Sequence, residues 1–280
     1  MASPDNRAPG LLRADDYVRL PAIPAHCRLA YGPAPDQFGD LYLPLSPGPY
    51  PVVILLHGGC WRAQFGLAPL GQLCTAFTHA GLAVWNLEYR RLGNGGGWPY
   101  TLRDAASGAA FLQSIAVHYA LDMARVVAVG HSAGGHLALW LAGRHHLPSD
   151  SPLWVAEAMQ VHGVVSLAGI PDLAAGVQRQ ICRGACQELV GGLPDEVPER
   201  YQHASPISLL PLGVPQWHLV GVHDPLVPAD YVQQYVAVAR QHDEVHLDLL
   251  PDAGHFDLVV PTTAAWPAVR HAVLTLLGRE

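Results

Sequence analysis

One short segment constrains this chain more than any other, because it forces a sharp turn between a strand and a helix. Residues 125–129 predict a buried strand, Gly130-His131-Ser132-Ala133-Gly134 follows at once, and residues 133–144 predict a helix. Side chains at positions 130 and 134 would collide with neighbouring backbone in such a turn, and glycine also permits its unusual dihedrals. The turn would project the Ser132 hydroxyl from the sheet edge and direct the positive end of the helix toward it. We therefore expect Ser132 to be a nucleophile.

The rest of the chain alternates between strand-like and helix-like segments. The expected strands are residues 26–31, 38–43, 51–57, 82–89, 125–129, 161–167, 216–222 and 245–250, and the expected helices are 101–119, 133–144, 231–241 and 264–277. Alternation of this kind predicts a fold of the α/β class, in which helices cover both faces of a mostly parallel sheet of about eight strands.

The chain reads as a single domain over residues 1–280, because no repeat or low-complexity linker divides it. Residues 1–12 predict a flexible tail. Residues 170–211 carry no strong strand signal, only short helical pieces separated by glycine and proline. A segment of this length without strands often covers a site, so we expect a helical cap or lid there. A surface excursion without a role is the alternative.

A serine hydroxyl is a weak nucleophile at neutral pH and needs a base that a third group orients. Asp224 follows the strand expected at 216–222, and His255 follows the last expected strand. Loops at the carboxyl ends of parallel strands are where such sheets build their sites, and the order serine, acid, histidine is typical of one hydrolase arrangement. We expect His255 to be the base and Asp224 to orient it. His223 and Asp252 are weaker candidates.

A glycine-rich turn, His57-Gly58-Gly59-Cys60-Trp61, follows the strand expected at 51–57. Acyl transfer places negative charge on a carbonyl oxygen, and fixed backbone N–H groups stabilise that charge. We expect the N–H groups of Gly59, Cys60 and Ala133 to form this oxyanion hole. Cys60 would contribute through its backbone and not through its thiol.

Composition excludes several classes of protein. The net charge is −7 and no basic cluster extends beyond Arg90-Arg91, which argues against a nucleic-acid partner. The longest apolar runs are far shorter than the roughly 20 residues that a membrane span needs. The first residues lack the apolar core of a signal peptide, so we expect a cytoplasmic protein.

Cysteine and histidine patterns predict neither a disulfide framework nor a metal site. The five cysteines are an odd count in a long chain, and we interpret Cys182 and Cys186 as two ordinary thiols. The sixteen histidines match none of the usual spacings of metal ligands.

Together these motifs resemble a known group of enzymes. His57-Gly58-Gly59-Cys60-Trp61 is similar to the His-Gly-Gly-x-Trp motif of the kynurenine formamidase group and of the feruloyl and acetylxylan esterase-like family. Glu88-Tyr89-Arg90-Arg91, Gly96-Gly97-Trp98-Pro99 and Asp104 resemble a further segment of these families. The resemblance runs from about residue 26 to the C-terminus. It implies an α/β-hydrolase fold, hydrolysis of an ester or aryl formamide, and no cofactor.

Five further residues receive more specific predictions. We expect an ion pair between Arg91 and Asp104 that ties the loop to the following helix. Trp61 adjoins the expected oxyanion turn, so we predict that it lines the substrate pocket. Trp98 and His131 are interpreted as packing residues, His131 inside the turn that carries Ser132.

The function we expect is a carboxylesterase that cleaves small or aryl esters through an acyl-enzyme, without a metal. An aryl-formamidase is the main alternative. A peptidase of the prolyl oligopeptidase type is disfavoured because no propeller-sized domain precedes the hydrolase segment, and a non-catalytic receptor would usually lack a triad residue. The sequence leaves the physiological substrate, the acyl chain length and the oligomeric state open.

Overall fold

A computed structural model describes residues 10–279 and contains one sheet of eight strands in the order β1-β2-β4-β3-β5-β6-β7-β8. The strands are β1 (Cys27–Ala30), β2 (Phe38–Tyr42), β3 (Tyr50–Leu56), β4 (Ala83–Leu87), β5 (Leu121–His131), β6 (Gly163–Leu167), β7 (Gln216–Gly221) and β8 (Val245–Leu250). β1 and β2 are antiparallel to their neighbours, whereas β4, β3 and β5 to β8 are parallel. The mostly parallel α/β sheet is confirmed, and each strand lies where the sequence predicted one.

The central strands explain why the prediction worked. Residues 52–56 of β3, 83–87 of β4 and 126–131 of β5 are buried without interruption. Strands that helices cover on both faces require continuous apolar runs, and such runs are the clearest indication of strands in this sequence.

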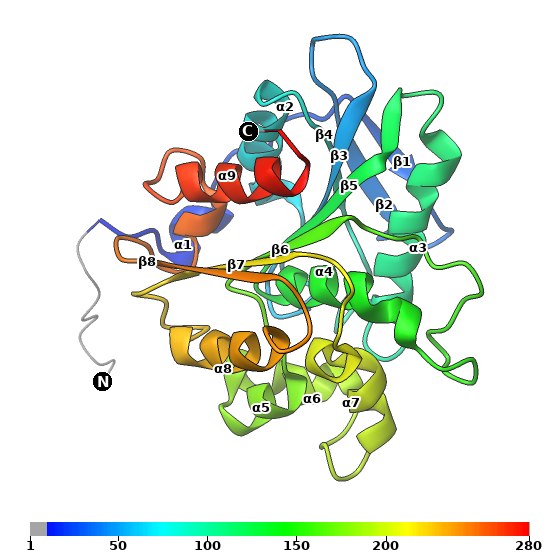
Figure 1. Ribbon diagram of the computed structural model, residues 1–280, viewed down its shortest axis with the longest axis vertical. Helices are drawn as coiled ribbons and strands as arrows, with labels where there is room; N and C mark the ends of the chain where they lie inside the picture. Colours follow the sequence, from blue (N-terminus) through cyan, green and yellow to red (C-terminus); the bar gives the residue numbers. More distant parts are fainter. Residues whose placement is uncertain (1–9, 280) are drawn as a thin grey trace.

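Helices cover both faces of the sheet (Figure 1). α2 (Gly71–His79) and α9 (Trp266–Leu276) lie together on one face, where Phe77 and Trp266 pack with ring centroids 5.3 Å apart. α3 (Tyr100–Ile115), α4 (Ala133–Gly143) and α8 (Ala229–Ala239) lie on the other face.

Two helices were not predicted, and both have weak local signals. α1 (Ala14–Val18) spans only five residues, and α2 begins at a glycine without a side-chain cap. Of the predicted tail, residues 1–9 lie outside the described part of the chain. Leu12, at its end, donates its backbone N–H to Asp257 at 3.4 Å.

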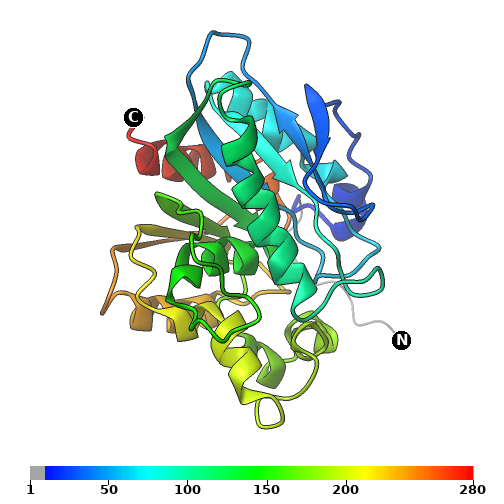
Figure 2. The same ribbon diagram turned by 90° about the vertical axis from the view of Figure 1, so that its right-hand side faces the viewer.

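The segment 170–211 contains only short helices: α5 (Leu173–Gln178), η3 (Ile181–Gly184), α6 (Ala185–Val190), α7 (Pro198–Ala204) and η4 (Pro206–Leu209). Figure 2 shows this cap segment grouped at one end of the molecule, next to α4. Two side chains of α4 fix it there. His136 Nε2 donates to the carbonyl oxygen of Ala204 at 2.9 Å, and Trp140 Nε1 donates to that of His203 at 2.8 Å.

Within residues 10–279, no helix combines the length and the apolar character that crossing a membrane requires.

His136 should make the fold sensitive to acid. Burial lowers the pKa of this histidine from 6.5 to about 4, although its bond to Ala204 opposes the shift. Between about pH 4 and pH 6.5, His136 therefore binds a proton in the unfolded chain but not in the folded chain. The stabilisation is fully present above pH 6.5 and is lost as the pH falls. The free energy of unfolding should drop by up to about 1.4 kcal/mol per pH unit from this residue alone.

Urea unfolding between pH 7.5 and 4.5 measures this slope. His136→Gln retains a donor for Ala204 but does not titrate. The change in unfolding free energy with pH should therefore be smaller in this variant by up to about 1.4 kcal/mol per pH unit. His79→Gln is the control, because His79 is exposed. A slope that His136→Gln leaves unchanged would contradict the prediction.

Candidate active site

The turn between β5 and α4 has the geometry that its glycines predicted. Ser132 adopts φ +53° and ψ −117°, a conformation that non-glycine residues rarely adopt. A Cβ at Gly130 would lie 2.0 Å from the carbonyl oxygen of Gly134, and a Cβ at Gly134 would lie 2.1 Å from that of Leu56. Any side chain at either position would displace backbone, so the requirement for glycine is confirmed.

Ser132 sits at the carboxyl end of β5 and is held by backbone on both sides. Its N–H donates to Leu167 of the neighbouring β6 at 2.9 Å, and its carbonyl accepts from His136 at 3.1 Å. The residue is 3% exposed. Unusual dihedrals persist at a residue only when the surroundings determine them, and they concentrate at functional sites.

Asp224 and His255 come together as a buried hydrogen-bonded pair. His255 Nδ1 donates to Asp224 Oδ2 at 2.6 Å. The other carboxylate oxygen accepts the N–H groups of Leu226 at 2.8 Å and Val227 at 2.9 Å. The carboxylate is thereby fixed, and the opposite ring nitrogen of His255, Nε2, is left as the basic atom.

His131 joins the loop of His255 to the turn of Ser132. Its Nε2 donates to the carbonyl oxygen of His255 at 3.0 Å, and the two rings lie 4.5 Å apart. Burial and the proximity of His255 lower the pKa of His131 well below its ordinary value. His131 is therefore neutral, and the interpretation that it packs inside the turn is confirmed. Asp257 accepts the N–H of Gly254 at 2.9 Å, so this nearby carboxylate holds the loop and not the imidazole.

The glycine-rich turn after β3 lies against the turn of Ser132. A Cβ at Gly58 would be 3.1 Å from the Cβ of Ser132. Gly59, Cys60 and Trp61 all have positive φ, at +108°, +53° and +53°. Within residues 10–279, no acceptor takes the N–H of Gly59, Cys60 or Ala133. Unpaired donors beside a candidate nucleophile are what an oxyanion hole requires.

A buried network that the sequence analysis missed holds this turn from the inside. His57 Nδ1 donates to Gly58 O at 2.7 Å and Nε2 donates to Glu88 Oε1 at 2.8 Å. Both partners are acceptors, and the ring stacks on Tyr89 with centroids 4.4 Å apart. The bond to Gly58 fixes the peptide plane that carries the N–H of Gly59.

Glu88 remains ionised although it is buried. Burial by itself raises the pKa of this carboxyl group, but His57, Arg91 and the N–H of Tyr89 together lower it below its ordinary value. Leu67 N–H donates to the second oxygen at 3.2 Å. The sequence analysis noted Glu88 only as part of a family motif. Its position directly after a buried strand could have indicated that it holds a neighbouring loop.

The predicted ion pair of Arg91 with Asp104 is wrong by one residue. Asp104 binds Arg90 instead, with Nε to Oδ2 and Nη2 to Oδ1 both at 2.7 Å. Arg91 pairs with Asp36 at 2.7 Å and with Glu88 at 3.1 Å. Successive side chains of an extended segment point to opposite sides, so Arg90 faces Asp104 of α3 whereas Arg91 faces Asp36 and Glu88.

Cys60 and Cys182 form a disulfide, which corrects the interpretation of Cys182 as an ordinary thiol. Their Cα atoms are 5.5 Å apart and their sequence separation is 122. The remaining cysteines, Cys27, Cys74 and Cys186, are free. Pairing over such a separation depends on where the cap segment lies, and the count of cysteines carries no information about that.

Trp61 has a different place from the predicted pocket wall. Its side chain is fully buried, its ring meets His136 edge-on at 5.2 Å, and its Nε1 has no acceptor among residues 10–279. Trp61 therefore packs beneath the turn. Trp98 is half-buried and packs near His203 and Arg200 of the cap segment, in agreement with its predicted packing role.

Comparison with a family model decides where the chain belongs. The BD-FAE model matches residues 40–237, which span most of the chain. The chain belongs to the BD-FAE family. This family of α/β-hydrolase esterases agrees with the predicted resemblance and with the eight-stranded sheet.

Curated relatives of this BD-FAE chain match part of its length. Probable isoprenylcysteine alpha-carbonyl methylesterases of Arabidopsis thaliana and Oryza sativa subsp. japonica are each 34% identical, over 113 and 115 residues. These matches cover 39% and 40% of the chain but only 23% and 26% of the relatives. The chain thus spans about a quarter of the length of the curated relatives it matches.

Solved structures similar to the BD-FAE chain share its fold. Esterase B from Lactobacillus rhamnosis has a TM-score of 0.77 at 18% identity and covers 90% of this chain and 84% of its own. A truncated carbohydrate esterase from gut microbiota has a TM-score of 0.75 at 19% identity, covering 91% and 99%. The Thermogutta terrifontis esterase Est2 with bound propionate has a TM-score of 0.71 at 20% identity, covering 90% and 94%.

Among the described residues of the BD-FAE chain, no group of three or more histidine, cysteine, aspartate or glutamate side chains could hold a metal ion.

Glu88→Gln should damage both stability and the glycine-rich turn. The amide nitrogen would face N–H donors, the charge of Arg91 would lose a counter-ion, and the His57 ring would lose its carboxylate partner. Breaking such a buried pair costs about 3–5 kcal/mol of unfolding free energy. Asp230→Asn is the control, because its pair with Arg179 is at the surface and contributes at most about 1 kcal/mol. Urea unfolding compares the two variants, and equal losses would contradict the prediction.

Proposed function

We propose that this protein is a serine carboxylesterase that cleaves small or aryl carboxylic esters through an acyl-enzyme. Ser132 is the nucleophile, His255 the base and Asp224 the residue that orients it. The observation that carries the proposal is the 2.6 Å bond between Asp224 and His255. His131 joins this pair to the turn of Ser132, which has unusual dihedrals and unpaired N–H donors around it. The esterase names of the structural neighbours and the methylesterase relatives support the same reaction class.

The first half of the reaction forms the acyl-enzyme. Nε2 of His255 accepts the hydroxyl proton as Ser132 Oγ attacks the ester carbonyl carbon. Nδ1–H stays bonded to Asp224, whose carboxylate stabilises the imidazolium. The carbonyl π electrons move to oxygen, and the resulting oxyanion accepts hydrogen bonds from the N–H groups of Gly59, Cys60 and Ala133. Collapse of this intermediate breaks the bond to the alcohol, which leaves with the proton from His255.

The second half regenerates the enzyme. His255 takes a proton from water, whose oxygen attacks the acyl carbon on Ser132. The second oxyanion accepts hydrogen bonds from the same three N–H groups. Its collapse releases the carboxylic acid while Ser132 regains its proton. The helix dipole of α4 favours the negative charge in both steps, since Ser132 immediately precedes the first residue of that helix.

The triad residues are testable one by one. Ser132→Ala should lower kcat by ~10⁴-fold or more while the fold persists, because no acyl-enzyme can form. His255→Ala should behave similarly, and Asp224→Asn should be somewhat less damaging because the base remains but is poorly oriented. A fluorophosphonate probe should label wild type at Ser132 alone. His223→Ala is a matched control, because this exposed histidine adjoins Asp224. Near-normal turnover by Ser132→Ala would refute the assignment.

Reaction class is tested by substrates compared side by side. We expect p-nitrophenyl acetate to be cleaved with a higher kcat/KM than p-nitrophenyl octanoate, because the sequence suggests no long apolar tunnel. N-formylkynurenine belongs in the same series, since activated esters react with any serine hydrolase. A kcat/KM on this formamide above that on the best ester would replace the proposed function with the formamidase alternative. Activity should persist in EDTA, and a loss that zinc restores would contradict a metal-free mechanism.

A further inference from the structure

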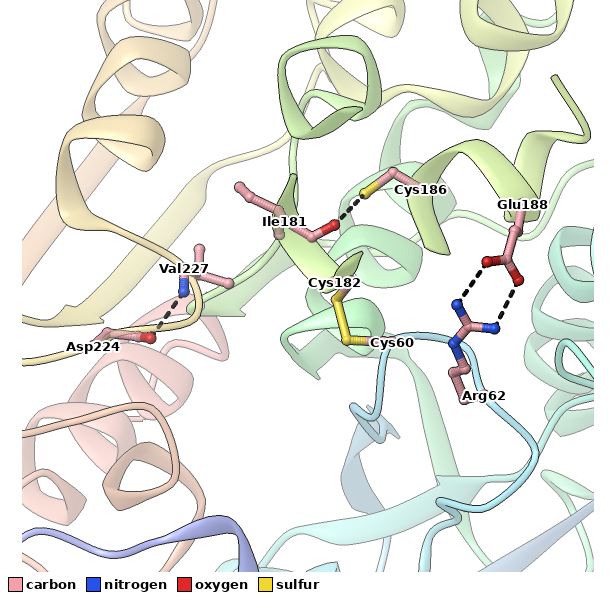
Figure 3. Close-up of a disulfide and its surroundings, with 8 residues drawn as sticks. All are labelled: Cys60, Arg62, Ile181, Cys182, Cys186, Glu188, Asp224 and Val227. Atoms are coloured by element: carbon pink, nitrogen blue, oxygen red, sulfur yellow. Dashed lines mark hydrogen bonds and ion pairs between the residues drawn. A yellow bond between two sulfur atoms is a disulfide. The ribbon is translucent and has the colours of Figure 1, made fainter. Parts of the chain in front are cut away.

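The disulfide joins two parts of the molecule that the proposed chemistry needs in fixed relation. Cys60 lies in the glycine-rich turn that supplies oxyanion donors, and Cys182 lies in the cap segment (Figure 3). Arg62 and Glu188 bridge the same two segments through a bidentate ion pair, with both N–O distances at 2.7 Å. The side chains of that pair are 33% and 50% exposed, so it is a weak restraint. The covalent bond is the strong connection between turn and cap.

Both ends of this connection have backbone conformations that are costly for their residues. On the turn, Cys60 has a φ of +53°. On the cap, Gln180, Cys182 and Arg183 have φ values of +55°, +58° and +48°. Left-handed conformations outside glycine persist only where surrounding structure holds them. A turn in this state relaxes readily once a restraint is removed, and relaxation rotates the peptide N–H of Cys60.

We propose that Cys182 is a positioning residue for the hydrolysis: through its disulfide it holds the Cys60 N–H in the oxyanion hole, so that reduction of the bridge slows catalysis. This inference rests on the proposed function. Cys182 itself touches neither substrate nor reacting atoms. Its effect passes through the backbone of Cys60, whose N–H has no hydrogen-bond acceptor within residues 10–279.

The switch is ordinary thiol–disulfide exchange. A thiolate of an added dithiol attacks one of the two sulfurs, a mixed disulfide forms, and the second thiol of the reagent closes its own disulfide. Two electrons and two protons pass to the protein, which ends with free thiols at Cys60 and Cys182. Both residues are half-buried, and the bridge therefore lies close to the surface. An oxidising compartment would keep the bridge closed, whereas a reducing cytosol would favour the open form.

A purely structural staple would give a different result. Closing a loop over this separation stabilises the folded state whatever the bridge does for catalysis. Loss of the bridge would then lower the melting temperature but leave kcat unchanged at a temperature well below melting. A positioning role lowers kcat while KM stays nearly constant, because the oxyanion donors act in the transition state.

The experiment compares wild type, Cys182→Ser, Cys186→Ser and Glu188→Gln on p-nitrophenyl acetate, with and without dithiothreitol. Reduced wild type and Cys182→Ser should both lose about 10- to 100-fold in kcat, because one donor of the oxyanion hole is misplaced. Dithiothreitol should not lower the variant further, and reoxidation should restore wild type alone. Cys186→Ser is the matched control: this free buried thiol lies four residues away, so the variant should respond to reduction as wild type does. Glu188→Gln should stay within about twofold of wild type.

Circular dichroism accompanies each measurement, and alkylation with mass spectrometry confirms which cysteines are free. If Cys182→Ser does not fold, the reversible reduction of wild type carries the test. Unchanged kcat in folded, fully reduced wild type would overturn the positioning role. Fluorophosphonate labelling of oxidised wild type separates the two proposals. Absence of label at Ser132 refutes the proposed function, whereas normal labelling and turnover with no effect of reduction refutes only the role of Cys182.

Discussion

The close approach of α4 to the end of β3 is the constraint on which the rest of the site depends. At Gly134 there is no room for a Cβ, because the carbonyl oxygen of Leu56 occupies that position. This contact places the serine turn and the glycine-rich turn side by side at the carboxyl edge of the sheet. The candidate nucleophile and the unpaired N–H donors are therefore brought together by backbone packing, before any side chain of the site makes a hydrogen bond.

The histidines of the site differ in role because their partners differ. His57 has an acceptor at each ring nitrogen, one of them the ionised Glu88. His131 is fully buried with one backbone acceptor, so burial keeps it neutral. His255 has a carboxylate at Nδ1 only. That carboxylate fixes the orientation of His255 and leaves Nε2 for proton transfer in the proposed mechanism. His131 also has an unpaired ring nitrogen, Nδ1, but that atom is fully buried.

The sequence predicted those parts of the molecule that local pattern determines. The eight strands and the serine turn follow from periodicity and from glycines that sharp turns require. Asp224 and His255 were proposed because each follows a predicted strand in the order typical of this hydrolase arrangement. The Arg91 pairing failed because one residue of register decides which arginine faces Asp104. The disulfide was missed because Cys182 meets Cys60 only after the cap segment packs on α4. The place of Trp61 was missed for a similar reason: adjacency to a turn does not tell which side of it a ring occupies.

The glycine-rich turn is held from two sides, and its own composition explains why it needs both. Three consecutive residues with positive φ cannot hold their shape through local preference. On the inner side, His57 and Glu88 fix the Gly58 peptide through buried charge-assisted hydrogen bonds. On the outer side, Cys182 restrains Cys60 covalently. In the proposed mechanism, the N–H donors stay unpaired until an oxyanion forms, so they receive no stabilisation from hydrogen bonds of their own. Their positions must therefore come from neighbouring groups, which is the physical meaning of preorganisation at this site.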